Sequence, residues 1–153
     1  MYMSKQYWLM KSEPTCFSID DMKHNKVEPW SGVRNYQARN FMKDMKKGDE
    51  VLFYHSSCTP PGVVGLVKVS KEAYPDDTAM NKKDDHYDPK HTLDNPRWYH
   101  VDVRFVKKFK DMVTLDRIKF NPKLKDMMVT QRGSRLSVQP VSQKHFEEIV
   151  KMS

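Results

Sequence analysis

The stretch WYHVDVRFVKKF, residues 98–109, decides the fold class. Its apolar residues Val101, Val103 and Phe105 alternate with charged ones, which is the two-residue period of a half-buried β-strand. Antiparallel sheets commonly bury one face and expose the other to water, and this alternation is typical of them. The segment therefore predicts a half-buried antiparallel strand.

Further segments on both sides are rich in β-branched and aromatic residues and are also predicted to be strands. They are YWLMKSE (7–13), EVLFYHS (50–56), GVVGLVKVS (62–70), MVTLDRI (112–118) and RLSVQPVS (135–142). Pro14 ends the first, and the last is expected to end before Pro140. The turn-rich SCTPPG between the second and third predicts a hairpin or a bent pair.

Helices are predicted early in the chain. Ser18, followed three residues later by Asp21, predicts a capping box at the start of a short helix in FSIDDMKHN. A second helix is expected to begin after Asn35 as its N-cap and to stop at Gly48. Its apolar residues recur at helical spacing and form a core face: Ala38, Phe41, Met42 and Met45.

Two more helical segments are predicted, around PKLKDMMV (122–129) and over SQKHFEEIVKM (142–152). A long polar segment, PDDTAMNKKDDHYDPKHTLDNPR (75–97), separates two strands, and a connection of that length is either disordered or functional. Antiparallel strands with helices inserted early and at the end predict one α+β domain over residues 1–153, with a strongly bent sheet or a partly closed barrel.

The net charge and the cysteines limit the class of protein. A formal charge of +7 over 153 residues favours anionic partners, and nucleic acid is preferred to membrane because no basic helix carries a lipid-facing stripe. Cys16 and Cys58, without a secretory signal or a long apolar run, predict a reduced cytoplasmic protein. His55 and Cys58 lack a second ligand pair at zinc spacing, so no metal and no cofactor are predicted.

The stretch EPWSGVRNYQARN, residues 28–40, has the composition of a binding site. Trp30 lies in a predicted loop, and the amides that follow Asn35 face that loop, where a phosphate could accept hydrogen bonds. Arg34 and Arg39 can clamp a phosphate or stack on a base. Structural alternatives stay open: Trp30 as a local plug, and Arg39 in an ion pair with Glu13 or Asp49.

Two strand ends are also unusually polar. In FYHSS (53–57), Tyr54, His55 and Ser56 crowd the C-terminal end of a strand, and in RLSVQP (135–140), Ser137 and Gln139 alternate with apolar residues. An aromatic ring beside polar strand ends is a way to hold a base outside its stack, because the ring contributes roughly 1–3 kcal/mol and side-chain donors read the base edge. These residues are therefore candidates for one base-binding pocket.

Signatures of catalysis are weak. The chain has no Walker loop, no nucleotide-binding glycine triplet and no His-Glu-x-x-His, and it contains 5 glycines. A non-catalytic binding module is therefore predicted. The alternatives are an enzyme that uses His55 or Tyr54 as acid or base on a nucleotide or a modified RNA base, a small-molecule pocket, or a partner-docking role.

Many separate motifs in one order resemble the EVE domain family. They are YWLMKSEP, FSIDDM, WSGVRNYQARNFM, GDEVLFYHSS, PPGVVGLVKV, AYPD, YDP, PRWYHVDV and RLSVQPVS. The resemblance runs from about residue 7 to 149. It implies a PUA-like bent mixed sheet or pseudo-barrel, related to YTH and ASCH domains. It also implies a reader of modified bases in DNA or RNA, modified cytosine foremost, with a partner in a restriction or modification pathway. The sequence does not show the basic N-terminal tail expected in a nuclear version, so a bacterial-type cytoplasmic protein is expected.

The resemblance also assigns expected roles to individual residues. Trp30 is the expected base-stacking wall, with Tyr54 as a second aromatic candidate. The remaining ligand-binding candidates are polar: Ser12, Ser31, Asn35, Tyr36, His55, Ser56, Ser137 and Gln139. Lys11, Arg34 and Arg39 are expected to hold flanking phosphates. The segment 76–96, with its Asp-rich half, is expected to act as a lid or a partner surface.

Overall fold

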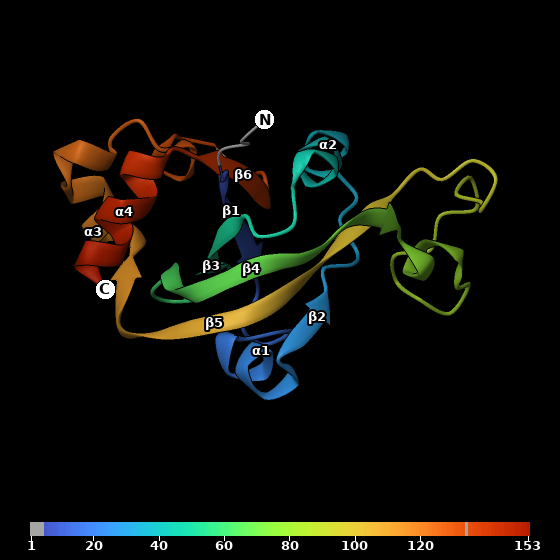
Figure 1. Ribbon diagram of the computed structural model, residues 1–153, viewed down its shortest axis with the longest axis horizontal. Helices are drawn as coiled ribbons and strands as arrows, with labels where there is room; N and C mark the ends of the chain where they lie inside the picture. Colours follow the sequence, from blue (N-terminus) through green and yellow to red (C-terminus); the bar gives the residue numbers. More distant parts are fainter. Residues whose placement is uncertain (1–4, 134) are drawn as a thin grey trace.

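The computed structural model describes residues 5–133 and 135–153, and its strands form one six-stranded, strongly curved sheet (Figure 1). The strands are β1 (Tyr7–Ser12), β2 (Val27–Pro29), β3 (Glu50–His55), β4 (Gly62–Pro75), β5 (Tyr99–Thr114) and β6 (Val138–Val141). Their order is β2-β5-β4-β3-β1-β6; β1 and β3 run parallel, and the other neighbours are antiparallel. The predicted α+β class with a bent mixed sheet is confirmed.

Within these residues the α-helices are α1 (Ile19–Asn25), α2 (Tyr36–Asp44), α3 (Leu115–Phe120) and α4 (Gln143–Met152). Short 3-10 turns are η1 (Asp77–Met80), η2 (Pro122–Leu124) and η3 (Met128–Thr130). Ser18 and Asp21 make both hydrogen bonds of the capping box of α1, and Asn35 Oδ1 accepts from the Ala38 amide at 3.0 Å at the start of α2. Both predicted N-caps are confirmed.

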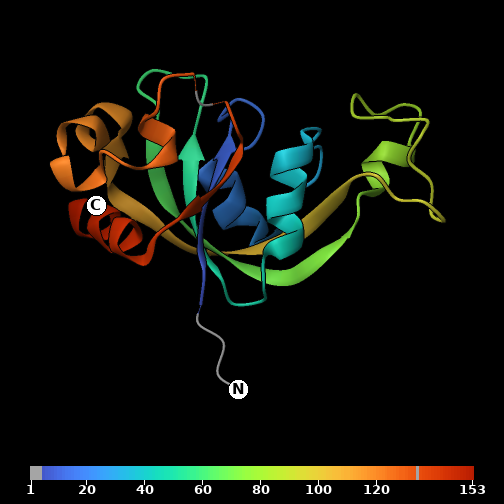
Figure 2. The ribbon, with the colours of Figure 1, turned by 90° about the horizontal axis from the view of Figure 1, so that it is seen from above.

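Both faces of the sheet are buried, because helices cover each of them. Trp8 and Met10 of β1 point into a core shared with α1 and α2, whereas Leu9 between them points into a core shared with α3 and α4. Figure 2 shows α3 and α4 together at one end of the sheet and α2 toward the other. The two-sided burial explains why β1 and β3 are nearly continuous apolar runs rather than alternating ones.

Three predicted boundaries are wrong. The segment 112–118 is not a separate strand: β5 continues to Thr114, and α3 begins at once because the Thr114 side chain accepts from the Arg117 amide. The last strand does not stop before Pro140 but runs through it to Val141, which an edge strand tolerates because proline there loses no ladder bond. The second helix ends before Gly48, at Asp44.

Two other segments differ from their prediction in kind. The helical stretch predicted around 122–129 forms the 3-10 turns η2 and η3 rather than one helix. The short strand β2 was not predicted at all, although it places the loop that follows it: the Trp30 amide donates to the Val101 carbonyl of β5 at 2.8 Å. The predicted hairpin of β3 and β4 and the final helix are confirmed.

Replacing Gly65 with alanine is expected to lower the melting temperature. An added Cβ would lie 2.4 Å from the Lys107 carbonyl oxygen and 2.7 Å from Ile19 Cδ1, so β4 would have to move away from β5 and α1. Overpacking of this kind costs about 1–3 kcal/mol. Thermal unfolding followed by circular dichroism measures the effect, with Ser70→Ala, a small change at a half-exposed position of the same strand, as the control. An unchanged melting temperature for Gly65→Ala would contradict this packing.

Candidate functional site

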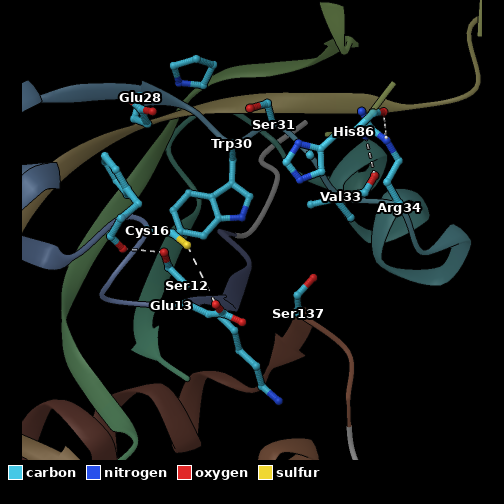
Figure 3. Close-up of a pocket in the computed structure, with 14 residues that line it drawn as sticks. Ser12, Glu13, Cys16, Glu28, Trp30, Ser31, Val33, Arg34, His86 and Ser137 are labelled. Carbon is cyan, nitrogen blue, oxygen red and sulfur yellow. Dashed lines mark hydrogen bonds between the residues drawn. The ribbon is translucent and has the colours of Figure 1, made fainter. Parts of the chain in front are cut away.

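A pocket of about 640 Å³ opens where the ends of several chain segments meet. This volume lies within the range of about 300–1,000 Å³ that small-ligand sites occupy. Figure 3 shows the indole of Trp30 at its centre. The lining residues are Lys11, Ser12, Glu13, Cys16, Phe17, Glu28, Pro29, Trp30, Ser31, Gly32, Val33, Arg34, His86 and Ser137.

Trp30 forms a fixed aromatic wall of this pocket. It is 8% exposed, and its ring packs edge-on against the core residue Phe53, with centroids 5.5 Å apart and planes at 85°. Trp30 Nε1 has no hydrogen-bond partner within residues 5–133 and 135–153, yet it is not among the buried unpaired atoms. Trp30 is therefore both a core residue and a pocket wall, with an accessible N–H donor.

Other polar groups around the wall remain available to a ligand. The Ser137 carbonyl accepts from the Lys11 amide at 2.8 Å, which joins the two strand ends, while the Ser137 hydroxyl has no bond in the described part of the chain. Burial lowers the pKa of Lys11, whose ammonium lies 5.7 Å from the centre of the Tyr54 ring. Ser12 Oγ, in contrast, already donates to the Phe17 carbonyl at 2.5 Å.

His86 reaches the pocket from the long connection between β4 and β5. Its Nδ1 lies 2.9 Å from Asp84 Oδ1, whose pKa is lowered first of all by the hydrogen bond from the His86 amide, so the carboxylate is ionised and can only accept. Neutral His86 therefore carries its proton on Nδ1, which leaves Nε2 as an acceptor. A Cβ at Gly32 would lie 2.9 Å from Nε2, so the ring packs directly on the pocket rim.

A buried carboxylate fastens this connection to the rim. Asp76 Oδ2 accepts from the Gly32 amide at 2.8 Å and from Arg34 Nη1 at 3.1 Å, while Oδ1 accepts from the amide and hydroxyl of Thr78 at 2.9 and 2.6 Å. Burial alone would raise the pKa of Asp76, but the hydrogen bonds from Thr78, Gly32 and Arg34 hold it below its ordinary value. The carboxylate is therefore ionised and fully paired.

We call the contacts of Asp76 with Gly32, Arg34 and Thr78 the clasp. Arg34 has few hydrogen-bond donors left for a ligand. Besides Asp76, its guanidinium donates to the carbonyls of His86 and Val33, at 2.9 and 3.0 Å, and to the Thr78 hydroxyl at 3.1 Å. Its predicted phosphate role stays a prediction, and its contacts are those of a residue that positions the rim. The segment 76–96 is thus folded against the pocket at His86.

Asp76 also lies close to Asp77 and His100, and one ligand atom from each falls within 4.8 Å of the others. Such a trio resembles a metal site. Each oxygen of Asp76, however, already accepts two hydrogen bonds, which leaves this carboxylate poorly placed to bind a cation. We therefore do not assign a metal centre to it.

The structure brings together six of the predicted site residues and leaves the others outside the pocket. The six are Lys11, Ser12, Trp30, Ser31, Arg34 and Ser137. Those outside are Asn35, Tyr36, Arg39, Tyr54, His55, Ser56 and Gln139. Asn35 is occupied as the cap of α2, and Arg39 bonds to Asn40 and to the Arg97 carbonyl rather than to Glu13 or Asp49.

The outside residues of β3 and β6 have structural contacts of their own. His55 Nε2 accepts from the Ile19 amide at 3.1 Å, and burial lowers the pKa of this imidazole. Burial, with a smaller effect from Cys58, raises the pKa of Tyr54 to about 12. The Ser56 amide donates to the Ser12 carbonyl, and Gln139 is 1% exposed and donates to the Leu136 carbonyl.

The prediction missed several pocket residues. Glu13, Cys16 and Phe17 directly follow β1, so the polar strand end could have indicated them. His86 lies 52 residues from Arg34 in the sequence, and no local signal places it there.

The sequence pattern of the EVE domain matches residues 6–152. The chain belongs to the EVE domain family. Thymocyte nuclear protein 1 of Rattus norvegicus is 46% identical to this EVE domain over 165 residues, which cover 95% of this chain and 73% of the relative. The predicted family is confirmed.

Solved structures agree with this membership. Human THYN1 protein, in complex with DNA containing 5-methylcytosine, superposes on this EVE domain with a TM-score of 0.90, 43% identity and 97% of each chain covered. A protein from Pseudomonas syringae superposes with a TM-score of 0.92 and is 45% identical, with 95% of this chain and 98% of its own covered. An ASCH protein from Zymomonas mobilis superposes with a TM-score of 0.55 and is 9% identical, with 97% of this chain and 99% of its own covered. At this identity the likeness shows a shared fold alone.

Proposed function

We propose that this protein binds nucleic acid by receiving one modified base, 5-methylcytosine in DNA foremost, in the pocket at Trp30. The observation that carries the proposal is the Trp30 ring in the wall of a pocket that it shares with the Ser137 hydroxyl, which has no hydrogen-bond partner among the described residues. It is supported by the family member that was solved with DNA containing 5-methylcytosine. The formal charge of +7 agrees with a polyanionic partner.

In the proposed mechanism, the base leaves its stack and lies against the indole of Trp30. Stacking on an aromatic ring contributes roughly 1–3 kcal/mol, which offsets part of the cost of unstacking. The Ser137 hydroxyl has no hydrogen-bond partner among the described residues and can bond the base edge, and Lys11 supplies a cation at the pocket wall. Trp30 Nε1 lies in the plane of the stacked indole, so it can donate only to a group beside the base. A methyl group that fills an apolar corner adds only about 1 kcal/mol, so the preference for the modified base is about fivefold.

We favour binding without catalysis, because neither acid–base candidate faces the pocket. His55 Nε2 already accepts a hydrogen bond from a backbone amide, and Tyr54 holds its proton strongly.

No helix in the described residues is long and apolar enough to cross a membrane.

Fluorescence anisotropy with matched oligonucleotides tests the proposal. Labelled DNA and RNA carry cytosine or 5-methylcytosine at one position, and the free nucleoside serves as competitor. Tighter binding of one modified oligonucleotide, with no new product by mass spectrometry, is the expected result. Equal affinity for all of them would overturn the reader proposal, and a product that disappears in His55→Ala would establish the enzymatic alternative.

We expect His86 to select a base with an exocyclic amino group. Its Nε2 acceptor matches the 4-amino donor of 5-methylcytosine, whereas thymine carries the same methyl group but presents an acceptor at that position. Wild-type protein should therefore bind 5-methylcytosine about tenfold more tightly than thymine, since one good base contact contributes about 1–3 kcal/mol. His86→Phe should lose this ratio. Equal ratios in both proteins would show that His86 does not read the base.

A further inference from the structure

We propose that a second surface beside the pocket binds the phosphodiester backbone of the nucleic acid. This surface, the arginine patch, consists of Tyr36, Arg39, Arg97 and Trp98. The inference rests on the proposed function, because the pocket receives one base and the patch receives the strand that flanks it. It also accounts for two predicted site residues, Tyr36 and Arg39, that the pocket leaves out.

The arginine patch is built on a fixed aromatic stack. The Tyr36 ring lies on the Trp98 ring with centroids 4.9 Å apart and planes at 23°. Trp98 is 5% exposed, and its Nε1 donates to Asp88 Oδ2 at 2.7 Å, whereas Tyr36 is 47% exposed. The exposed tyrosine is thus held in place before any ligand arrives, so little conformational entropy is lost on binding.

Two guanidinium groups lie over this stack. Arg39 and Arg97 lie 4.9 and 5.7 Å from the centre of the Tyr36 ring. Arg39 donates at 2.9 Å to the Arg97 carbonyl, and Arg97 donates at 2.5 Å to the Tyr36 hydroxyl. These contacts position the two cations side by side on one surface.

Both guanidinium groups keep free donors. Each carries five N–H groups, of which Arg39 uses three and Arg97 two in hydrogen bonds with described residues. Arg97 is paired at 3.4 Å with Asp88, while Arg39 makes no salt bridge with any described residue. An excess of positive charge with free, planar donors fits the paired oxygens of a phosphate group.

The patch adjoins the pocket. Arg34 lines the pocket, and its guanidinium carbon lies 5.5 Å from the centre of the Trp98 ring, so the two surfaces meet there. Two turns beyond Tyr36, α2 adds Lys43, whose ammonium lies 4.8 Å from the centre of the Tyr99 ring. A strand with one base in the pocket can therefore run past Arg34 and along α2, meeting cations in succession.

The test is the salt dependence of DNA binding by the double variant Arg39→Gln/Arg97→Gln. Its matched control, Lys119→Gln/Lys151→Gln, removes the same charge from exposed positions on α3 and α4. Affinities for DNA with cytosine and with 5-methylcytosine are measured between about 50 and 200 mM salt. Each lost phosphate contact should reduce the slope of log affinity against log salt by about 0.9.

We expect the double variant to lose about two units of slope and about tenfold in affinity for both DNAs, with an unchanged ratio between them, as phosphate contacts carry no base information. The control should keep the wild-type slope. An unchanged slope in the double variant, or an equal loss in the control, would overturn the proposal. The proposal would also be overturned if the ratio of the affinities for the two DNAs changed while the salt slope stayed constant, because these arginines would then contact the base.

The two proposals fail separately. If wild-type protein shows no base preference but the double variant still loses slope, the pocket proposal fails and the patch remains. If Arg97→Gln disturbs folding in a thermal scan, Arg39→Gln alone serves, since the Arg39 side chain bonds only to Asn40 and to the Arg97 carbonyl among described residues. Its expected loss is about one unit of slope. Saturable binding of an acidic peptide in place of DNA would contradict the patch as a phosphate site.

Discussion

Replacing Asp76 with alanine is expected to lower the free energy of unfolding by about 3–5 kcal/mol, because it removes one partner of a buried, hydrogen-bonded charge pair. The carboxylate is inaccessible to solvent and accepts from Gly32, Arg34 and Thr78. Without it, those donors are left unpaired and the Arg34 charge is uncompensated. Chemical denaturation measures the change.

Asp77→Ala is the matched control, because the neighbouring carboxylate is exposed and its removal should change the stability by less than about 0.5 kcal/mol. Asp76→Asn should fall between the two, since the amide can accept two of the same hydrogen bonds. A loss below about 1 kcal/mol for Asp76→Ala would contradict the clasp between the pocket rim and the long connection.

The same carboxylate contributes to acid sensitivity. Its pKa in the folded protein lies below the ordinary value, since hydrogen bonds from Thr78, Gly32 and Arg34 outweigh the burial that raises it. The unfolded chain therefore binds the proton more readily. The stabilisation is complete above the unfolded pKa and is lost as the pH falls through the folded one. The difference in stability between wild type and Asp76→Ala should therefore shrink below about pH 4.

Trp30→Ala is expected to weaken binding of DNA containing 5-methylcytosine by about 5- to 150-fold, the equivalent of the 1–3 kcal/mol that stacking of one base contributes. Preference over cytosine should be lost as well, since the base no longer has a wall that fixes its position. Trp30 also packs on Phe53, so the variant loses stability, and its folded fraction must be checked by thermal unfolding.

Two further variants separate binding from folding. Trp30→Phe keeps an aromatic face and should retain most of the affinity. Trp8→Phe removes a buried indole that donates to Asp49 at 3.0 Å and is not among the residues that line the pocket, so it should lower stability without altering the base preference. Equal affinity of wild type and a folded Trp30→Ala would show that the tryptophan is a structural plug.

The parts of the fold that follow from local chemistry could be predicted from the sequence. The caps at Ser18 and Asn35 bond within three residues, and the alternation at Val101 and Val103 reflects burial on one side of a strand. The end of β5 was missed because the β-branched residues of 112–118 continue the strand pattern across Thr114, whose hydroxyl caps the next helix.

The candidate site was predictable only in part. Polar residues at the ends of β1 and β6 do meet at the pocket with Trp30. Tyr54 of β3 instead points into the core shared with α3 and α4, because successive side chains of a strand alternate between the two faces of the sheet. His86 and Asp76 depend on how a long connection folds back onto the rim. That contact is made across more than 40 residues, which no local pattern encodes.

The most direct test of base capture uses the indole N–H signals of the 3 tryptophans in a proton–nitrogen correlation spectrum. Trp8 and Trp98 donate to Asp49 and Asp88, whereas Trp30 Nε1 has no partner in the described residues, so its signal should be distinct and is assigned by its absence in Trp30→Phe. On titration with DNA containing 5-methylcytosine, the Trp30 signal should shift most, and DNA with an abasic position there should leave it in place. A Trp30 signal that responds equally to both DNAs, or to neither while binding proceeds, would contradict a base stacked on Trp30.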